Sequence, residues 1–553
     1  MTRAKYIRPL LILIAAATIA GADAVAQQTD YSQVSSTPIT LTLDEAVQVA
    51  LARSYAVREA RLDVEVANAQ VREAFGTLVP QIDLNTTYTR NVKSANPFAG
   101  SEAGGLFQTL GFIDWLAFNE LARTDSDPTT DPITLLDFTQ QRQDALEDAG
   151  AIVSGSDNPF AIPNQATASI TAEQTLFDMR AILGAAGAKK YLAALNRSAL
   201  ERQEQLIVND VRQAFYGALL AEENARVVRQ SADRTRATRD ETAQRVASGV
   251  LPKVQRLSAD VELANLESNL IRARKQSADA VDGLKLLLGM PVEQEVILHG
   301  ELESEIEASV VAISVPAAVA AALERRADLE QARIAIELQQ VQQRVSRSDY
   351  FPTITAFGSV GYVGSVPANR QSIISNPNDP FSFSVRQNGI FSDNYWDLTA
   401  SVGVRLSWNL FNGLQTHNRM QRQKLETERV RLRYEQLQQS VRAEVQSALR
   451  ELEATQLQIA SQEQNVVRAD LNYSHARARL DEGVASQLEE RQASDLLDQS
   501  RLTYLQAIHD FLAARSELEA AIGATSGATT ELNITSAAKP GRESNESHAA
   551  NQN

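Results

Sequence analysis

Histidines, cysteines and paired carboxylates are the side chains that most often carry catalysis or hold metals, and this chain offers few of them in useful patterns. It contains no cysteine, which excludes disulfides, thiolate metal sites, cysteine nucleophiles and a lipid-anchoring cysteine. Its five histidines are scattered without ligand spacing. Gly184 to Gly187 precede lysines but lack the spacing of a phosphate-binding loop. We therefore expect neither an enzyme nor a cofactor, and look for function in surfaces and charge.

Net charge and the N-terminal segment indicate which partners and which location to expect. The 553 residues carry a formal charge of −16, which argues against nucleic acid because phosphate binding requires a basic face. Residues 1–26 have the basic start, short apolar run and Ala-Val-Ala end of a signal peptide. Their removal takes away three basic residues and Asp23, which lowers the charge from −16 to −18. The protein is expected to be exported, and since no later segment resembles an ~18-residue apolar span, any membrane insertion must use strands.

The chain repeats itself. With an offset of 272, the segment from Leu41, LTLDEAVQVALARS, superimposes on the segment from Ile313, and Pro80 superimposes on Pro352. Further along, the matching offset is 234, which places Gly249 on Gly483 and Gly289 on Gly523. The offset thus falls by 38, which predicts a long surface loop in the first copy.

Each copy contains one very long helix. No Gly or Pro occurs between Leu414 and Glu482, and as a helix this run would be roughly 100 Å long. Such a helix needs support along its length, and its apolar residues recur every seven positions, as in a left-handed coiled coil. The seam comprises Val445, Leu452, Ile459, Val466, Tyr473 and Leu480. A soluble two-stranded coiled coil would give the same pattern.

Segments with a period of two lie between the helices. Between Trp396 and Asn409 apolar residues alternate with polar ones, and the same holds for two segments of the first copy, although Gln174 interrupts one of them. A fourth segment, Thr353–Tyr362, is rich in glycine and shows the pattern most weakly. A strand of a soluble sandwich would look identical, but the export signal favours membrane strands. Four strands cannot close a barrel, since the smallest membrane barrels have ~8. The strands therefore predict an oligomer in which each subunit supplies part of the wall.

Two short segments, Arg245–Pro252 and Arg479–Ser486, share the pattern Arg-x-x-x-Gly. The glycine permits a tight turn between antiparallel helices, and Pro252 or Ser486 can begin the returning helix. An ordinary helical hairpin would need no more than this.

Together these motifs resemble the TolC-type outer membrane efflux factors, from about Leu41 to Gly523. The resemblance rests on the opening LTLDEAV, the strand-initiating prolines Pro80 and Pro352, LFD or LFNG after the second strand, and Arg-x-x-x-Gly at both turns. It implies a mainly α protein with a membrane β-barrel, built from two tandem repeats of helix, strand, strand, long helix and helix. A homotrimer would form a 12-stranded β-barrel in outer membrane lipid, continued by a periplasmic α-helical barrel.

The resemblance also implies the protein's role and partners. The family provides the exit duct of tripartite efflux or type I secretion systems, passively conducting substrates from an inner-membrane pump through a periplasmic adaptor protein. The alternative is a periplasmic structural coiled-coil protein without a channel.

The expected organisation follows the repeats. The first repeat spans 27–289, the linker, expected to form an equatorial belt, spans 290–315, the second repeat spans 316–523, and a disordered tail spans 524–553. In the first repeat we expect a helix at 44–75, strands at about 81–90 and 166–177, an outer loop at 91–165, a long helix at about 181–247 and a return helix at about 253–288. In the second we expect a helix at 317–348, strands at about 353–363 and 395–409, an outer loop at 364–394, a long helix at about 414–482 and a return helix at about 486–522.

Site residues are assigned by the same resemblance. Adaptor docking is expected at the two turns, through Arg245, Gly249, Val250, Leu251, Pro252, Arg479, Gly483, Val484, Ala485 and Ser486. In the family, acidic residues six positions after the second glycine form a ring at the periplasmic entrance. The matching residue is Glu489, followed by Glu490, whereas the first copy has Gln255. An ordinary solvated helix face would explain the two glutamates equally well, because Glu is common throughout this helix. Arg256 and Arg491 are candidates for ion pairs that hold this entrance shut. The apolar run Leu106–Phe118 in the first outer loop either roofs the barrel mouth or packs on its rim.

Overall fold

The computed structural model describes residues 38–93, 102–125, 130–151, 162–303, 314–367, 369–376 and 379–524. The expected signal peptide and all but the first residue of the expected tail lie outside these residues. The chain divides into two compact units. The helical unit comprises the described parts of Met1–Ala67, Ala193–Glu337 and Glu428–Asn553, and the strand unit comprises those of Asn68–Leu192 and Leu338–Thr427.

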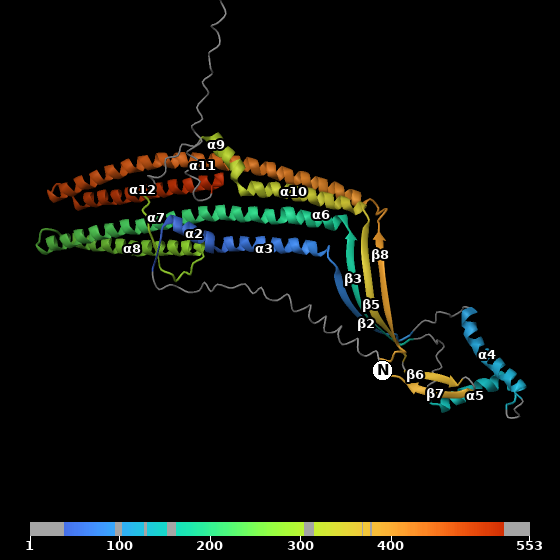
Figure 1. Ribbon diagram of the computed structural model, residues 1–553. Helices are drawn as coiled ribbons and strands as arrows, with labels where there is room; N and C mark the ends of the chain where they lie inside the picture. The colour runs from blue at the N-terminus through green and yellow to red at the C-terminus, as the bar shows by residue number, and fades with distance from the viewer. Residues whose placement is uncertain are drawn as a thin grey trace, which may run out of the picture. The chain divides into compact units, whose positions relative to one another are not determined.

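The first repeat contains more elements than expected (Figure 1). Its helices are α2 (Leu43–Arg53), α3 (Tyr55–Gly76), α4 (Glu102–Thr124), α5 (Leu135–Asp148), α6 (Met179–Gly187), α7 (Ala193–Ala247) and α8 (Lys253–Leu288). Its strands are β1 (Ile39–Leu41), β2 (Gln81–Arg90) and β3 (Asn164–Phe177), and one π-helical turn, Ala188–Leu192, separates α6 from α7. The expected outer loop 91–165 thus holds two helices, and the expected long helix 181–247 is interrupted.

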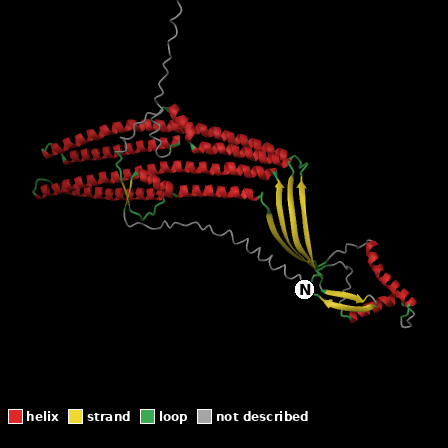
Figure 2. Ribbon diagram, in the orientation of Figure 1, coloured by secondary structure: helices red, strands yellow, loops and turns green. Residues whose placement is uncertain are grey.

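The second repeat has the same order of helices and sheet strands outside its outer loop. Figure 2 distinguishes the helices from the strands by colour. Its helices are α9 (Val315–Arg325), α10 (Ala327–Arg347), α11 (Gln415–Asp481) and α12 (Gln487–Ile522), with a 3-10 turn at Ser348–Tyr350. Its strands are β5 (Thr353–Val366), β6 (Gln371–Asn376), β7 (Asp379–Gln387) and β8 (Trp396–Ser407). The expected outer loop 364–394 therefore contains a β-hairpin. The expected linker contains β4 (Val296–Leu298), which pairs in parallel with β1.

The first helix of each repeat is broken, contrary to the single helices expected at 44–75 and 317–348. Ser54 and Arg326 leave the helical conformation between the two halves, with ψ of 135° and 121°. Gly289 and Gly523 end the return helices with φ of 68° and 78°. A Cβ on Gly289 would lie 2.4 Å from the carbonyl oxygen of Arg53, and one on Gly523 3.1 Å from that of Arg325. The breaks thus occur where each return helix ends against the first helix, a contact that sequence periodicity does not record.

The opening motif LTLDEAV has a local explanation. Thr42 and Glu45 form a capping box at the start of α2, in which the Thr42 backbone N–H donates to Glu45 Oε2 at 2.9 Å and the Glu45 N–H donates to Thr42 Oγ1 at 3.4 Å.

The core of the helical unit consists of two apolar clusters. The larger joins α2, α7, the end of α8 and α12, with Phe215, Leu284, Leu288, Ile508 and Leu512 almost fully buried. The smaller joins α9, α11 and α12 around Ala318, Ala322, Val441, Val445 and Ile522. The seam of apolar residues at intervals of seven contributes to this core, since Leu452 packs against both clusters.

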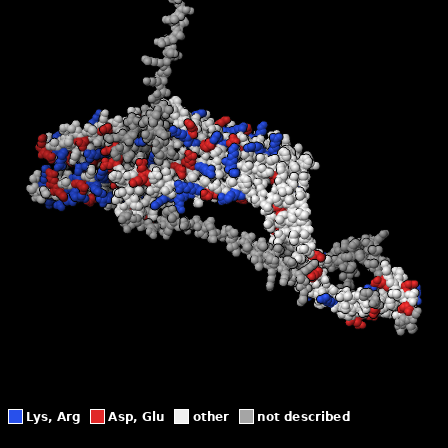
Figure 3. All heavy atoms as spheres, viewed as in Figure 1, with Lys and Arg blue, Asp and Glu red and all other residues white. Residues whose placement is uncertain are grey.

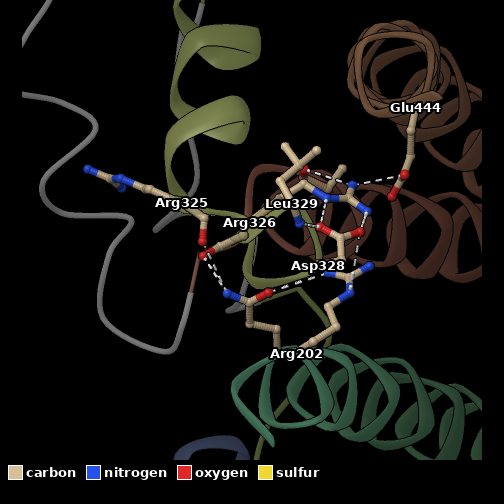
Figure 4. Close-up of polar contacts among 9 residues, drawn as sticks. Arg202, Arg325, Arg326, Asp328, Leu329 and Glu444 are labelled. Atoms are coloured by element: carbon tan, nitrogen blue, oxygen red, sulfur yellow. Dashed lines mark hydrogen bonds and ion pairs between the residues drawn. The ribbon is translucent and has the colours of Figure 1, made fainter. Parts of the chain in front are cut away.

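A buried ionic cluster fixes the helix break at Arg326 (Figure 4). The Arg326 side chain, 3% exposed, makes two hydrogen bonds to Asp328 at 2.7 and 3.0 Å and an ion pair with Glu444 at 2.9 Å. It also donates to the carbonyl of Ala521 at 3.2 Å, and Arg202 lies 3.9 Å from Asp328. The cluster therefore links both repeats, because Arg202 belongs to α7 and the other partners to the second repeat.

In the strand unit, four strands form one antiparallel sheet in the order β2-β3-β5-β8. The register gathers apolar residues on one face, which Thr86 and Gln174 interrupt: Ile82, Leu84, Tyr88, Ala168, Ile170, Ala172, Val360, Tyr362, Leu398, Ala400, Val402, Val404 and Leu406. The opposite face carries polar residues, including Asp83, Glu173, Asp397 and Arg405. Most of these apolar side chains are exposed in a single chain, with Val402 at 90%. An exposed apolar sheet face with a polar reverse is the pattern of a strand set between lipid and water.

Gln174 interrupts the apolar alternation of β3, but its side-chain amide hydrogens find backbone acceptors. Its Nε2 donates to the carbonyls of Leu78 and Thr175, both at 2.8 Å, next to an irregularity between Thr175 and Phe177. The polar residue thus sits where β3 ends and its amide hydrogens are shared with backbone.

The two outer loops pack into one small folded cap, made of α4, α5 and the β6–β7 hairpin. Three aromatic rings from different elements, Phe118, Phe138 and Phe381, have centroids 5.2–5.6 Å apart. Arg142 on α5 pairs with Asp114 on α4 at 2.6 Å. The apolar run Leu106–Phe118 thus belongs to α4, which has partners within the cap.

Candidate functional site

The two helical hairpin turns have the same backbone structure. Arg245 and Arg479 each offer a carbonyl that accepts two N–H groups beyond the helix end: from Val250 and Leu251 at 2.9 and 3.2 Å, and from Val484 and Ala485 at 2.9 and 3.0 Å. Gly249 and Gly483 lie between, with φ of 80° and 77°. This is the Schellman arrangement, in which a left-handed residue lets the last carbonyls of a helix be satisfied. The Arg-x-x-x-Gly spacing therefore encodes the turn itself.

The returning helices begin differently. Ser486 caps α12, since its Oγ accepts the N–H of Glu489 at 3.3 Å, whereas Pro252 precedes α8 without a side-chain cap. Pro fits there because it has no N–H to leave unsatisfied.

Apolar side chains are exposed around both turns. Val250 is 69% exposed, Val484 67% and Leu488 53%. Val254 and Leu257 continue this surface along α8 at 65% and 64%. Clustered exposure of large aliphatic residues is typical of a surface that meets a partner.

Polar contacts join the two hairpins beside the turns. Gln487 Nε2, on α12, donates to Thr242 Oγ1, on α7, at 2.9 Å. Arg477, on α11, lies 3.6 Å from Glu241 of α7 and 3.9 Å from Glu490 of α12. We call Glu241, Thr242, Arg477, Gln487 and Glu490 the hairpin contact set.

A second arginine, Arg234, also links α7 to α12. Arg234 of α7 contacts Asp498 of α12. Arg234 Nε and Asp498 Oδ2 are nevertheless buried without a hydrogen-bond partner among the described residues.

Glu490 is buried within the hairpin contact set. Only 6% of the residue is exposed, and burial raises the pKa of its carboxyl above the usual value, although Arg477 and Arg234 act in the opposite direction. The neighbouring hydroxyl of Tyr473 also has a raised pKa, because of burial and then the charge of Glu490. A buried carboxyl with a perturbed pKa is a candidate functional group.

The remaining entrance candidates are dispersed. Glu489 is half exposed and lies 3.5 Å from Arg479. Arg256 approaches Asp260 of its own helix at 3.8 Å, and Arg491 pairs with Glu262 of α8 at 2.8 Å. Gln255 has a buried Oε1 without a partner among the described residues. Within one chain, therefore, Arg491 joins the hairpins, whereas Arg256 does not, and Glu490 faces the protein interior.

Three residues of this region, Thr242, Arg477 and Arg234, carry no signal in the sequence. Thr242 and Gln487 are 245 positions apart, and the partners of Arg477 and Arg234 include residues of other helices, so no local spacing marks them. Tyr473 can be singled out in the sequence, because it is the one residue of the apolar seam that has a hydroxyl group. The strand-initiating prolines directly precede β2 and β5.

Among the described residues, no three His, Asp or Glu side chains are grouped so that they could hold a metal ion.

The comparisons with known proteins decide the family. A family model described as outer membrane efflux protein matches residues 134–290 and 318–524, about two thirds of the chain and one segment in each repeat. The chain belongs to the outer membrane efflux protein family. By its description the family consists of outer membrane efflux proteins, which places this protein in the outer membrane. No curated protein matches the chain significantly.

Solved structures share the fold at low identity. The CmeC outer membrane channel of Campylobacter jejuni matches with a TM-score of 0.60 at 13% identity, over 89% of each chain. The outer membrane protein VceC of Vibrio cholerae matches with a TM-score of 0.56 at 15% identity, over 87% of this chain and 96% of that one. The MtrE outer membrane channel of Neisseria gonorrhoeae, in its open state, matches with a TM-score of 0.57 at 16% identity, over 87% and 89%.

These matches confirm the expected fold class and the resemblance drawn from the motifs. The family match favours an outer membrane efflux protein over the alternative of a channel-free periplasmic coiled coil. In the part of the chain that the structure describes, no helix is both long enough and apolar enough to cross a bilayer.

Proposed function

We propose that the protein is the exit duct of a tripartite efflux or type I secretion system, working as a homotrimer with a periplasmic adaptor protein and an inner-membrane pump. The observation that supports this most is the four-stranded sheet. Its edge strands β2 and β8 have no partner on one side among the described residues, while one face is mostly apolar. Unpaired backbone edges are not tolerated in lipid. Pairing of β8 with β2 of the next copy satisfies both edges, and three copies supply twelve strands.

The hairpin turns are proposed to dock the adaptor. Their exposed aliphatic residues Val250 and Val484 offer apolar area, Leu251 adjoins it, and Arg245 and Arg479 flank it. The identical backbone of the two turns would present the adaptor with two similar surfaces in each subunit, and six in a trimer.

The hairpin contact set is proposed to hold the periplasmic entrance in its resting position. It joins α7 to the α11–α12 hairpin through Thr242–Gln487 and Glu241–Arg477. Opening would require these contacts to part. Glu489 is proposed to contribute an acidic ring when three copies surround the axis, where like charges repel and attract cations.

Covalent locking tests the role of the contact set. The double variant Thr242→Cys/Gln487→Cys is made in a chain that has no other cysteine. Cross-linking with a short thiol-specific reagent should abolish export in cells, and a reductant that cleaves the reagent should restore it. Each single variant, treated identically, is the control. Unimpaired export by the cross-linked protein would contradict an entrance that opens here.

Oligomeric state and conductance test the duct itself. Purified protein in mild detergent should have the mass of three chains and should form ion-conducting pores in planar bilayers. Deletion of the gene should sensitise cells to a pump substrate. A protein that stays monomeric and non-conducting would refute the proposal.

A further inference from the structure

The helix ends next to the sheet carry an excess of positive charge. Between Leu338 and Phe351 and between Leu410 and Thr427 there are five arginines and lysines but only two acidic residues, Asp349 and Glu426. The whole chain, by contrast, has a charge of −16. Figure 3 shows blue side chains gathered where α10 and α11 approach the nearly uncharged strands. Local charge opposite to that of the whole chain points to an anionic partner.

Three of these cations are exposed and unengaged. Arg344, Arg347 and Lys424 are exposed, and no ion pair involves any of them within the described residues. The nearby acidic residue Asp349 is already shared by Arg180, at 3.7 Å, and Arg419.

The packing of α10 places its two cations on one side. Val341 faces α6, where it would meet a Cβ on Gly187 at 2.3 Å, and Gln339 bonds to Gln423 of α11 at 2.7 Å. At about 100° per residue around the helix axis, Arg344 and Arg347 both lie on the part of the α10 surface between Val341 and Gln339.

The course of α11 adds the third cation to the same side. Because α11 runs antiparallel to α10, the helical step after Gln423 turns Lys424 towards the side that carries Arg344 and Arg347. Arg422, one residue before Gln423, turns to the opposite side by the same rule. The three cations therefore share one surface, and the exposed Arg422 does not belong to it.

Aromatic residues mark the level of the membrane surface. Tyr350, Phe351 and Trp408 are 48%, 50% and 56% exposed at the ends of β5 and β8, and Trp408 Nε1 donates to the Tyr350 carbonyl at 3.1 Å. Such residues gather at the level of lipid headgroups.

The cations lie close to this level. Arg347 lies three residues before Tyr350 and Arg344 six, or about 5 and 9 Å along a helix. Lys424 lies five residues, about 8 Å, beyond Arg419, which contacts Asp349.

We propose that Arg344, Arg347 and Lys424 form a basic collar that binds the anionic headgroups of phospholipids in the periplasmic leaflet of the outer membrane. Guanidinium groups pair with phosphate through two parallel hydrogen bonds, and basic residues close to an anionic membrane attract it within a Debye length of about 8 Å. The collar would fix the depth of each subunit in the bilayer. It requires the outer-membrane location but no particular pump or adaptor.

Native mass spectrometry of the full-length protein in mild detergent tests the collar. Delipidated protein is titrated with phosphatidylglycerol or with zwitterionic phosphatidylethanolamine. The wild type should retain phosphatidylglycerol preferentially, and Arg344→Gln/Arg347→Gln/Lys424→Gln should bind it about tenfold more weakly. The matched control Arg433→Gln/Arg450→Gln/Arg468→Gln removes three exposed charges further along α11 and should bind as the wild type does.

Two further arms separate lipid recognition from a structural defect and from simple phosphate binding. Arg344→Lys/Arg347→Lys keeps the charge and should retain at least half of the lipid binding, whereas a merely structural defect would not be rescued. Soluble glycerol phosphate at equal concentration should not displace the lipid.

Equal binding by the glutamine variant and the wild type, or full displacement by glycerol phosphate, would overturn the collar. Because mass and conductance report on the duct independently, a trimer that conducts but lacks the lipid preference would refute the collar alone.

Discussion

At the scale of single residues, the turn glycines are defined by backbone conformation and not by crowding. A Cβ on Gly483 would meet nothing within 4 Å, yet its φ of 77° disfavours any other residue. We expect Gly483→Ala to destabilise the hairpin by about 1–2 kcal/mol. Thermal unfolding should show a lowered Tm. Gly184→Ala is the control, since Gly184 lies within α6 with equal space and no positive φ, and should leave Tm unchanged or raise it.

The buried carboxyl of Glu490 should make the stability of the folded protein depend on pH. Since burial raises the pKa of Glu490 in the folded state, its protonated form is favoured there, so its stabilising contribution is complete below pH ~4.5 and is lost as the pH rises through the folded pKa. Glu490→Gln, which mimics the neutral form, should remove this part of the pH dependence of Tm and should not lower Tm at pH 7. Glu489→Gln, at a half-exposed position, should leave the pH profile as it is. An unchanged profile in Glu490→Gln would contradict the assignment.

The Arg326 cluster allows a third test at this scale. Removing one member of a buried ion pair leaves the other charge uncompensated, which typically costs about 3–5 kcal/mol. Arg326→Met should therefore lower the denaturant midpoint strongly. The adjacent Arg325→Met, at an exposed position, should change it little. Similar midpoints for the two variants would show that the cluster contributes no specific stability.

At the scale of elements, the register of the sheet separates lipid from water residue by residue. Val402 lies on the apolar face and Ser401 on the polar face, paired with Ser359. A basic residue facing lipid at mid-depth costs about 2–4 kcal/mol. We expect Val402→Lys to reduce the amount of folded protein in outer membranes, measured by heat-modifiable gel mobility. Ser401→Lys should be tolerated, and equal loss in both variants would contradict the assignment of the faces.

Elements with a strong period were predictable. The alternation in the chain located β2 and β8 to within a few residues, because one face of each strand is mostly apolar. The run without Gly or Pro located α11, because nothing in it interrupts the helix. The breaks at Ser54 and Arg326 were not predictable, since they depend on Gly289 and Gly523 from the far ends of the repeats.

The candidate site was predictable only in part. The turns carry a local pattern, Arg-x-x-x-Gly, which encodes hydrogen bonds of the backbone. The contact set does not, because Thr242 and Gln487 come from different repeats and meet only in the folded chain. The roles of the turns in docking and of Glu489 in gating stay predictions.

At the scale of the whole molecule, the outer cap should be separable from the duct. The backbone N–H of Asn91 donates to the Pro163 carbonyl at 2.7 Å, and its side chain donates to the Ile162 carbonyl at 2.9 Å, so the two ends of the first outer loop meet. None of the pairs in the four-stranded sheet involves α4 or α5. Loops with adjoining ends tolerate shortening.

We therefore expect that replacing residues 94–161 with a short Gly/Ser linker leaves trimers in the outer membrane, as measured by fractionation and native gels. Phe381→Ser is combined with the deletion, because the deletion removes Phe118 and Phe138 and would leave the Phe381 ring without these partners. Loss of the deletion variant from the outer membrane would show that the cap takes part in assembly.

The open edges of the sheet have a genetic consequence. If every complete wall needs three copies, a cell that makes intact and assembly-competent but blocked chains in equal amounts has only about one duct in eight built wholly from intact chains. A damaged allele of this gene would thus be dominant, and its harm would rise steeply with its share of expression. A channel closed within each chain would show a simple proportional loss instead.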